Sequence, residues 1–167
     1  MMNNKIPLVD KFKTRIKEVI GEMGTQEIDI DEREINKFCE LIDDNNSIYL
    51  DDAVAIKTGY KGRLIPPGYF MSITNRAISQ FFIIIGPEFY QKFATGVIHT
   101  SSEVEFYSPM LLNKKYKVKI DLTEPVKKTG KKGTYYSIVF KTSILDENDT
   151  IYAIDNHEFF IKLAGDR

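Results

Sequence analysis

The first regular pattern in the chain is helical. Apolar residues recur at intervals of three and four, at Ile35, Phe38, Cys39 and Ile42. This spacing places them on one face of a helix. Asp31, followed three residues later by a glutamate, resembles the capping box that begins helices, and the turn-forming residues 44–47 end the pattern. We therefore predict a helix over about 31–43, with Cys39 as a small core residue rather than a nucleophile.

A longer helix is predicted after the Pro-Pro-Gly sequence at 66–68. Apolar residues occupy nearly every face from Tyr69 to about Ile84, and Gly86 with the following proline ends the pattern. A helix that is apolar on all sides is a buried helix. A shorter helix is expected over 51–58.

The second half of the chain alternates between apolar and polar residues. The alternating runs cover 103–109, 116–123, 136–144 and 151–163, and turn residues at 129–133 and 146–149 mark hairpin tips. Residues 27–30 are a candidate for a further short strand. Strands with one polar face are typical of antiparallel sheets. The prediction is an α+β fold in which a meander of four or five strands wraps around the long helix.

Composition fits one globular domain. The chain has 167 residues, of which 43% are hydrophobic and 28% charged, with a net charge of −1. This balance argues against disorder and offers no basic excess for nucleic acid. We expect a single domain over 1–167, with a core over about 19–162 and residues 1–18 as an N-terminal extension.

Cysteine content and hydropathy bear on location. The single Cys39 has no partner for an internal disulfide, which fits a reducing cytoplasm. Residues 1–10 lack the apolar stretch of a signal peptide. The most apolar run, 81–85, is much shorter than the roughly 20 residues of a membrane span. We expect a cytoplasmic protein with no membrane partner.

The nearly neutral charge conceals two segments of opposite sign. Residues 21–52 hold eleven acidic and two basic residues, whereas residues 113–132 hold eight lysines and two acidic residues. Both segments are compatible with ordinary solvated surfaces. The alternative is that the lysine-rich segment meets an anionic ligand group.

Short motifs, taken in order, resemble one known family. The stretch Phe-Cys-Glu-Leu-Ile-Asp-Asp-Asn-Asn-Ser-Ile-Tyr-Leu-Asp at 38–51 resembles the segment that opens the active site of MaoC-like hydratases and dehydratases. The closer likeness is to their FAS1-like, or MaoC N-terminal, dehydratase subgroup. Its other motifs are Gly-Tyr-Lys-Gly at 59–62, Pro-Pro-Gly at 66–68, Ile98-His99 and Glu-Val-Glu-Phe-Tyr-Ser-Pro at 103–109. The resemblance covers roughly 19–162 and implies the hot-dog fold.

The resemblance also implies site residues. In the hydratases, an aspartate and a histidine five positions later hold the water that adds to, or leaves from, a 2-enoyl thioester. Asp44 takes the aspartate position, Asn46 the asparagine two residues on, and Gly68 the glycine whose backbone amide forms the oxyanion hole. The alternative for Asp44 is a cap of the following turn. Tyr49 stands where the family has histidine, and this is the main departure from the family pattern.

That departure affects the chemistry. Dehydration of a 3-hydroxyacyl thioester needs a base for the α-proton and an acid for the departing hydroxyl. An imidazole serves either role near pH 7, whereas a phenol with pKa near 10 donates a hydrogen bond but is a poor base. Asp44 would then act as the base, with Tyr49 as the donor. Alternatively, a second hot-dog subunit supplies the Asp/His pair.

The remaining candidate residues concern substrate contacts. Pro67 and Tyr69 are expected to line the acyl site. His99 either faces the acyl pocket or is an ordinary strand residue, and His157 is expected to be a satisfied sheet residue. Four hairpin lysines are expected to meet coenzyme A phosphates or an acidic acyl carrier protein. The alternative is that they are merely solvated. They are Lys127, Lys128, Lys131 and Lys132.

These expectations combine into one functional hypothesis. The chain is an (R)-3-hydroxyacyl-thioester dehydratase or 2-enoyl-CoA hydratase, or the acyl-binding subunit of one, working as a homodimer or as a heterodimer with a second hot-dog subunit. The sequence offers neither metal-ligand spacing nor a glycine-rich phosphate loop, so no metal or redox cofactor is expected. The alternatives are a non-catalytic acyl-thioester binding or assembly protein and a hot-dog thioesterase.

Overall fold

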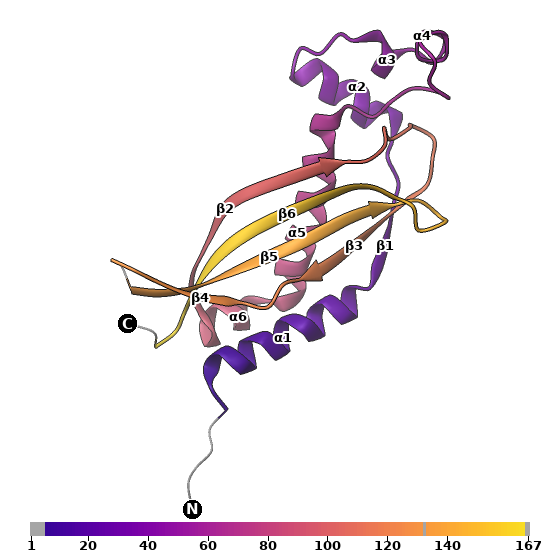
Figure 1. The fold of residues 1–167 in the computed structure, drawn as a ribbon. Helices are drawn as coiled ribbons and strands as arrows, with labels where there is room; N and C mark the ends of the chain where they lie inside the picture. The colour runs from indigo at the N-terminus through magenta and orange to yellow at the C-terminus, as the bar shows by residue number, and fades with distance from the viewer. Residues whose placement is uncertain (1–5, 132, 166–167) are drawn as a thin grey trace, which may run out of the picture.

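One antiparallel sheet and the central helix, α5, form the framework of the chain (Figure 1). The computed structural model describes residues 6–131 and 133–165. The helices are α1 (Leu8–Met23), α2 (Glu32–Leu41), α3 (Ser47–Leu50), α4 (Asp52–Lys57), a 3-10 turn (Pro67–Tyr69), α5 (Phe70–Ile85) and α6 (Pro87–Lys92). The strands are β1 (Thr25–Ile28), β2 (Ala94–Phe106), β3 (Tyr116–Leu122), β4 (Val126–Gly130), β5 (Gly133–Leu145) and β6 (Ile151–Leu163). The predicted α+β class is confirmed.

The strand order differs from a simple meander. The sheet runs β1-β3-β5-β6-β2, and β4 pairs with the part of β5 that projects beyond β3. β2 therefore lies beside β6, at one edge of the sheet, although β3 follows it in the chain. Alternation in a sequence shows which face a residue occupies but not which strands are neighbours, so the order was not predictable from it.

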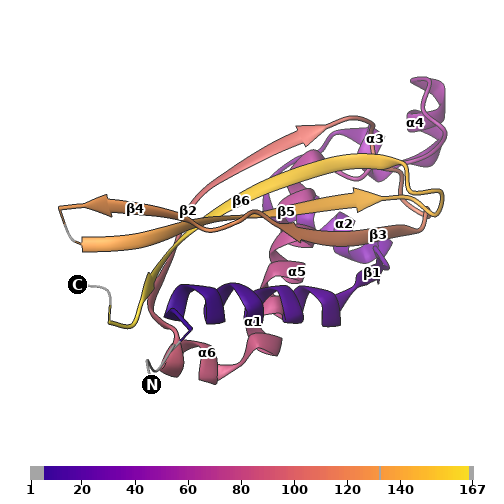
Figure 2. The same ribbon diagram turned by 60° about the horizontal axis from the view of Figure 1, so that its bottom comes forward.

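The large helices all lie on one face of the sheet (Figure 2). α5 packs its apolar side against the strands, where the rings of Phe81 and Phe140 lie 4.9 Å apart. The prediction that α5 is buried on all sides is wrong, because Asn75 and Gln80 are exposed and Ile83 is 77% exposed. The sheet and α1 cover only part of the helix surface, so one flank stays open.

The segment before residue 19 contributes to the core. Phe12, Ile16 and Val19 of α1 are fully buried, and the ring of Phe12 lies 5.6 Å from that of Phe89 on α6. Packing therefore begins well inside the segment that the sequence suggested as an extension. None of the helices in the described ranges is long and apolar enough to span a bilayer.

Three short helices, α2 to α4, form a cap beyond the end of the sheet, near the N-terminus of α5 (Figure 1). The helices predicted at 31–43 and 51–58 are confirmed as α2 and α4. Asp31 caps α2, since its carboxylate accepts the Arg33 N–H at 2.7 Å, and Asp51 caps α4 in the same way. Cys39 is a buried core residue, as predicted, and burial raises the pKa of its thiol.

Candidate active site

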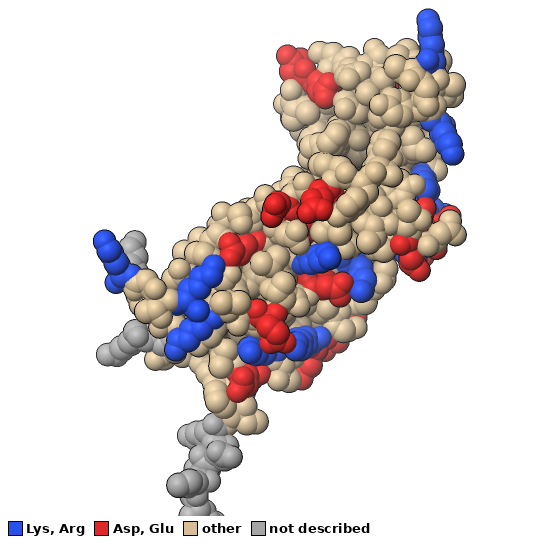
Figure 3. All heavy atoms as spheres, viewed as in Figure 1, with Lys and Arg blue, Asp and Glu red and all other residues tan. Residues whose placement is uncertain are grey.

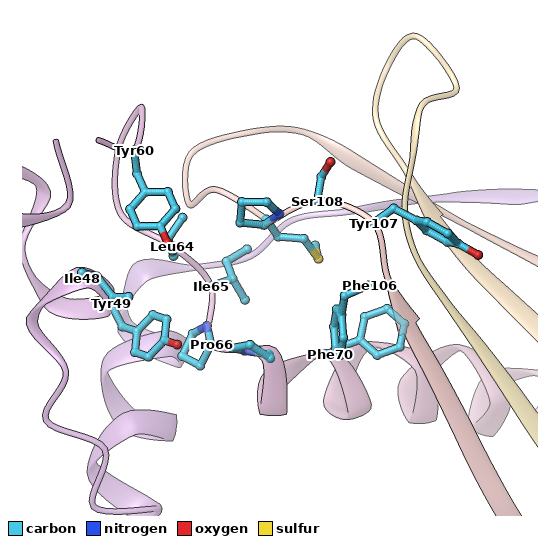
Figure 4. A pocket seen from close by; sticks show the side chains of 13 residues that line it. Ile48, Tyr49, Tyr60, Leu64, Ile65, Pro66, Phe70, Phe106, Tyr107 and Ser108 are labelled. Carbon is cyan, nitrogen blue, oxygen red and sulfur yellow. The ribbon is translucent and has the colours of Figure 1, made fainter. Parts of the chain in front are cut away.

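A pocket of about 380 Å³ opens between the cap and the sheet, beside the start of α5 (Figure 4). Its apolar walls include Ile48, Leu64, Ile65, Pro66, Phe70, Phe106 and Met110, and Tyr49, Tyr60, Tyr107 and Ser108 also line it. The Tyr49 hydroxyl points into the pocket, whereas the Tyr107 hydroxyl points away and donates to Glu105 (Figure 4). Phe70 of α5 and Phe106 of β2 meet edge to face, with ring centroids 5.4 Å apart. The pocket thus joins the cap, the central helix and an edge strand.

Arg63 fixes the cap wall of this pocket. Its side chain is buried, and its guanidinium donates to the Tyr49 carbonyl at 2.9 Å and the Asn36 side chain at 2.6 Å, and also pairs with Glu32. Its backbone N–H donates to Asp52 at 2.8 Å. A single arginine therefore connects α2, α3 and α4. Nothing in the sequence around Arg63 distinguishes it from a surface arginine, so this role was missed.

Tyr49 lines the pocket as a proton-bearing phenol. Burial raises the pKa of Tyr49, and the nearby Asp44 carboxylate raises it further. Tyr49 is thus a hydrogen-bond donor at neutral pH and a poor base. Asp44 is half-buried, is not among the lining residues, and accepts the Asn46 N–H at 3.1 Å. The catalytic roles of this pair stay predictions.

Gly68 lies in the 3-10 turn that leads into α5, and Pro67 beside it lines the pocket. The N–H groups in the first turn of a helix lack intrahelical acceptors and lie at the positive end of its dipole. A Cβ atom on Gly68 would lie 3.3 Å from Cζ of Phe38, so the site has little room for a side chain. Gly68 itself is not among the lining residues, and its role as the oxyanion hole stays a prediction.

Two other predicted contact residues have structural partners instead. The Tyr69 hydroxyl donates to Glu34 at 2.6 Å, and burial together with this bond raises the pKa of Tyr69 to about 12. Its buried ring joins the turn to α2 and does not line the pocket. Asn46 caps α3 by accepting the Ile48 N–H at 3.2 Å.

The two histidines lie together on the sheet and not in the pocket. The His99 ring on β2 stacks on His157 of β6 with centroids 4.0 Å apart. His157 is buried, with Nδ1 2.9 Å from the Ser102 hydroxyl and 3.1 Å from the Asp155 carboxylate. The prediction that His157 is a satisfied sheet residue is confirmed.

The hairpin lysines lie at the opposite end of the sheet from the pocket. Lys127 and Lys128 are on β4 and Lys131 is in the following turn, whereas Lys132 lies outside the described residues. Figure 3 shows basic side chains gathered at this end of the molecule. None of the three described lysines lines the pocket.

Several lining residues had no predicted role. Tyr60, Phe106, Tyr107 and Ser108 belong to the motifs at 59–62 and 103–109, so the resemblance pointed to their segments without assigning them a function. The described lining residues include no aspartate, glutamate, histidine, cysteine or lysine. The pocket therefore offers hydroxyl donors and apolar surface, but no group that ordinarily titrates near pH 7. The described residues also contain no cluster that could hold a metal ion.

Comparison with known protein families decides the assignment. The family model for the FAS1-like, dehydratase domain region matches residues 18–153. The chain belongs to this family. No curated protein sequence matches the chain.

Solved structures show the fold of this FAS1-like dehydratase domain. The ChsH1-ChsH2 complex from Mycobacterium tuberculosis has a chain 22% identical, with a TM-score of 0.64 and coverage of 92% of this chain and 94% of that chain. The (R)-hydratase from A. caviae involved in PHA biosynthesis is 15% identical, with a TM-score of 0.60 and coverage of 81% and 91%. The C-terminally truncated HadBC (3R-hydroxyacyl-ACP dehydratase) complex from M. tuberculosis is 12% identical, with a TM-score of 0.62 and coverage of 82% and 90%. The hot-dog fold is confirmed.

Proposed function

We propose that this FAS1-like dehydratase domain is the acyl-binding subunit of a hot-dog dimer that interconverts 3-hydroxyacyl and 2-enoyl thioesters, with a partner subunit supplying the Asp/His pair. The observation that carries the proposal is the chemistry of the pocket. It has apolar walls, phenol donors and a helix N-terminus, but no described lining group with an ordinary pKa near neutrality. Such a site suits binding and polarising a thioester more than moving its protons.

Each part of the pocket has a role in this proposal. The Gly68 amide and the positive end of α5 stabilise the negative charge that develops on the thioester oxygen. The Tyr49 hydroxyl donates a hydrogen bond to an oxygen of the substrate. Phe70 and Phe106 bound the acyl chain. Asp44, whose carboxylate is close enough to Tyr49 to raise the pKa of its phenol, is the candidate base from this chain.

The edge strand β2 supports the pairing with a second subunit. β2 has thirteen residues and pairs with β6 on one side, so its other side offers backbone groups for strand addition. Ile98 and Phe106 on this strand are both exposed. The ChsH1-ChsH2 and HadBC structures are complexes.

The test follows the loss of enoyl absorbance of crotonyl-CoA. We expect no turnover by the purified chain alone and turnover when a second hot-dog protein encoded by an adjacent gene is added. Full turnover by the chain alone would contradict the division of the site between two subunits. Release of free CoA would indicate a thioesterase, and tight binding without turnover in any mixture would indicate a non-catalytic acyl-thioester protein.

Asp44→Asn measures what this chain contributes to the chemistry. If Asp44 is the base, the variant lowers kcat of the active assembly by at least about 100-fold, the lower range for general base catalysis. Asp43→Asn is the matched control, because Asp43 is an exposed neighbour with φ of 54° and asparagine tolerates this left-handed conformation. Equal activity of both variants would exclude Asp44 as the base and leave this chain with substrate binding alone.

A further inference from the structure

The end of α2 is an exposed part of the cap that the proposed chemistry does not use. Leu41 and Ile42 are large apolar residues, yet they are 75% and 51% exposed. Glu40 beside them is exposed and has no ion pair with another described residue, and the last turn of α2 contains no basic residue. The C-terminus of a helix is also the negative end of its dipole. We call Glu40, Leu41 and Ile42 the α2 tip, a surface that is both apolar and negative.

The β4–β5 hairpin has the complementary composition. Lys127 and Lys131 are exposed, and neither forms an ion pair within the described part of the chain. Lys128 differs, because it is engaged by Glu158 at 3.4 Å. Val126 at the start of β4 adds an apolar side chain that is 57% exposed. Figure 3 shows acidic atoms at one end of the cap and basic atoms at the hairpin end of the sheet.

These two surfaces are too far apart to meet within one chain. The pairing register runs straight across the sheet from Lys127 on β4 through Tyr136 and Ile161 to Val97 on β2. The cap lies beyond the other end of β2, where Phe106 lines the pocket together with cap residues. Val97 and Phe106 are nine positions apart on β2, about 30 Å at roughly 3.3 Å per residue. Any contact between the α2 tip and a hairpin therefore involves a second molecule.

A second copy that pairs with β2 brings the two surfaces together. Antiparallel addition reverses the second copy, so the hairpin end of its sheet lies beside the cap end of this one. Its β4 then lies four strand spacings from this chain's β2, on the order of 19 Å at about 4.8 Å each, because β2, β6 and β5 of the second copy lie between. In Figure 1 the cap extends beyond the sheet on the β2 side, and the ten residues of α2 span about 15 Å. The α2 tip is therefore within reach of the second hairpin.

We propose that two copies of this chain pair along β2 and that the α2 tip of each docks on the β4–β5 hairpin of the other, with Glu40 facing Lys127 and Lys131. The inference rests on the pairing through β2 in the proposed function, and it names a second copy of the chain as a partner that this edge accepts. The pairing is isologous, so the contact occurs twice and the assembly closes at two chains.

Charge complementarity favours a second copy over an unrelated partner. One chain carries both surfaces, they are opposite in charge, and antiparallel pairing joins the two ends that hold them. Exposed ion pairs contribute little individually, so the charges select the partner and the register while the apolar side chains add buried area. The contact joins side chains and adds no backbone hydrogen bond to β4.

The test measures the dissociation constant of the dimer by analytical ultracentrifugation of the purified full chain. We expect Lys127→Glu/Lys131→Glu to weaken the dimer roughly tenfold or more, because the change acts in both contacts and turns attraction into repulsion. Glu40→Lys should weaken it as well. A chain that carries all three substitutions should regain most of the affinity, since the charges are then exchanged across both contacts.

Two further variants separate the apolar part of the contact from effects of net charge. Leu41→Ser/Ile42→Ser removes exposed apolar surface from the α2 tip and should also weaken the dimer. The matched control Lys11→Glu/Lys115→Glu changes the net charge as much as the hairpin variant does, at exposed positions on α1 and just before β3. It should dimerise like the original chain.

The outcomes separate this inference from the proposed function. A monomer at every concentration, equal dissociation constants for the hairpin and control variants, or no recovery in the triple variant overturns the inference. A chain that stays monomeric but pairs with a different hot-dog subunit overturns this inference and not the proposed function. Failure to turn over crotonyl-CoA in any mixture counts against the proposed function alone. Circular dichroism spectra identical to that of the original chain show that each variant is folded.

Discussion

Arg63 shows how much the cap depends on one buried side chain. Its guanidinium donates to the Tyr49 carbonyl in α3 and to the side chains of Glu32 and Asn36 in α2. Only 4% of the residue is exposed, so water cannot replace these bonds while the cap stays packed. Removing the guanidinium leaves the Tyr49 carbonyl and the Asn36 side-chain oxygen without this donor.

We predict that Arg63→Leu lowers the free energy of unfolding by about 2–4 kcal/mol, the range for loss of a buried hydrogen-bonded network. Urea unfolding followed by circular dichroism measures the change. Arg33→Leu is the control, because the Arg33 side chain is 90% exposed and its pair with Asp31 is a surface ion pair worth about 0–1 kcal/mol. Similar losses in the two variants would contradict the role assigned to Arg63.

Asp146 gives a prediction about acid stability. Its carboxylate accepts from Lys114 at 3.0 Å and from the N–H groups of Asn148 and Thr150 in the β5–β6 turn. The Lys114 ammonium in particular lowers the pKa of Asp146 to about 2. An unfolded aspartate has a pKa of about 3.9, so the folded state favours the ionised form. This contribution is present above about pH 4 and is lost as the pH falls toward 2.

Asp146→Asn should therefore unfold at a lower temperature than the original chain at pH 6, and the difference should shrink between pH 4 and pH 2. Thermal unfolding at a series of pH values measures it. Asp121→Asn removes an exposed carboxylate on β3 as the control and should leave the pH profile of the original chain in place. If the difference in unfolding temperature between Asp146→Asn and the original chain stayed constant down to pH 2, the carboxylate charge would not contribute to stability.

Residue roles that depend on local chemistry were predictable from the sequence. Roles that depend on where the side chain points in the fold were not. Asp31 as a helix cap and Cys39 as a core residue follow from spacing alone. Tyr69 and Asn46 lie in the expected segments, yet Tyr69 reaches back to Glu34 and Asn46 caps α3. A motif places a residue in the chain, but its neighbours in space decide where the side chain points.

Among the helices and strands, α1 shows most clearly that the apolar pattern of a segment does not by itself predict whether it joins the core. Phe12, Ile16 and Val19 recur at helical spacing, but lysine, arginine and glutamate surround them. In isolation this segment is polar enough to be taken for an extension. α5 lies close by and provides the apolar surface that the narrow stripe on α1 needs, and only the fold brings the two helices together.

Ile16→Ala tests whether α1 belongs to the cooperative core. Ile16 is fully buried, so we predict a loss of about 2–5 kcal/mol in the free energy of unfolding, as for other isoleucine-to-alanine changes in cores. Chemical denaturation measures it. Lys11→Ala on the exposed side of the same helix is the control and should stay within about 0.5 kcal/mol of the original chain. If α1 were only loosely attached, both variants would have the same free energy of unfolding as the original chain.

At the scale of the whole molecule, the two long edges of the sheet are unequal. β1 is a strand of four residues, whereas β2 has thirteen. β5 and β6 lie in the middle and have paired neighbours on both sides. The proposed second subunit would cover β2 and leave β1 open.

Hydrogen–deuterium exchange should reveal this asymmetry. At high protein concentration, or with the partner present, we predict slow exchange in β2 as well as in β5 and β6, and faster exchange in β4, which pairs only with β5. Dilution below the dissociation constant should speed exchange in β2 alone. Fast exchange in β2 at every concentration, together with a monomer by size-exclusion chromatography, would contradict the pairing through this edge.

The open edge of β2 also bears on how a cell must produce this protein. A long edge strand accepts any other strand that fits it, and natural proteins avoid this by shortening, charging or covering such edges. Newly made chains that outnumber their partner would pair with one another along β2 and form closed homodimers, because each chain has one long edge. For the proposed heterodimer, balanced synthesis of the two subunits, from one transcript or in close succession, would keep these homodimers from competing with the active assembly.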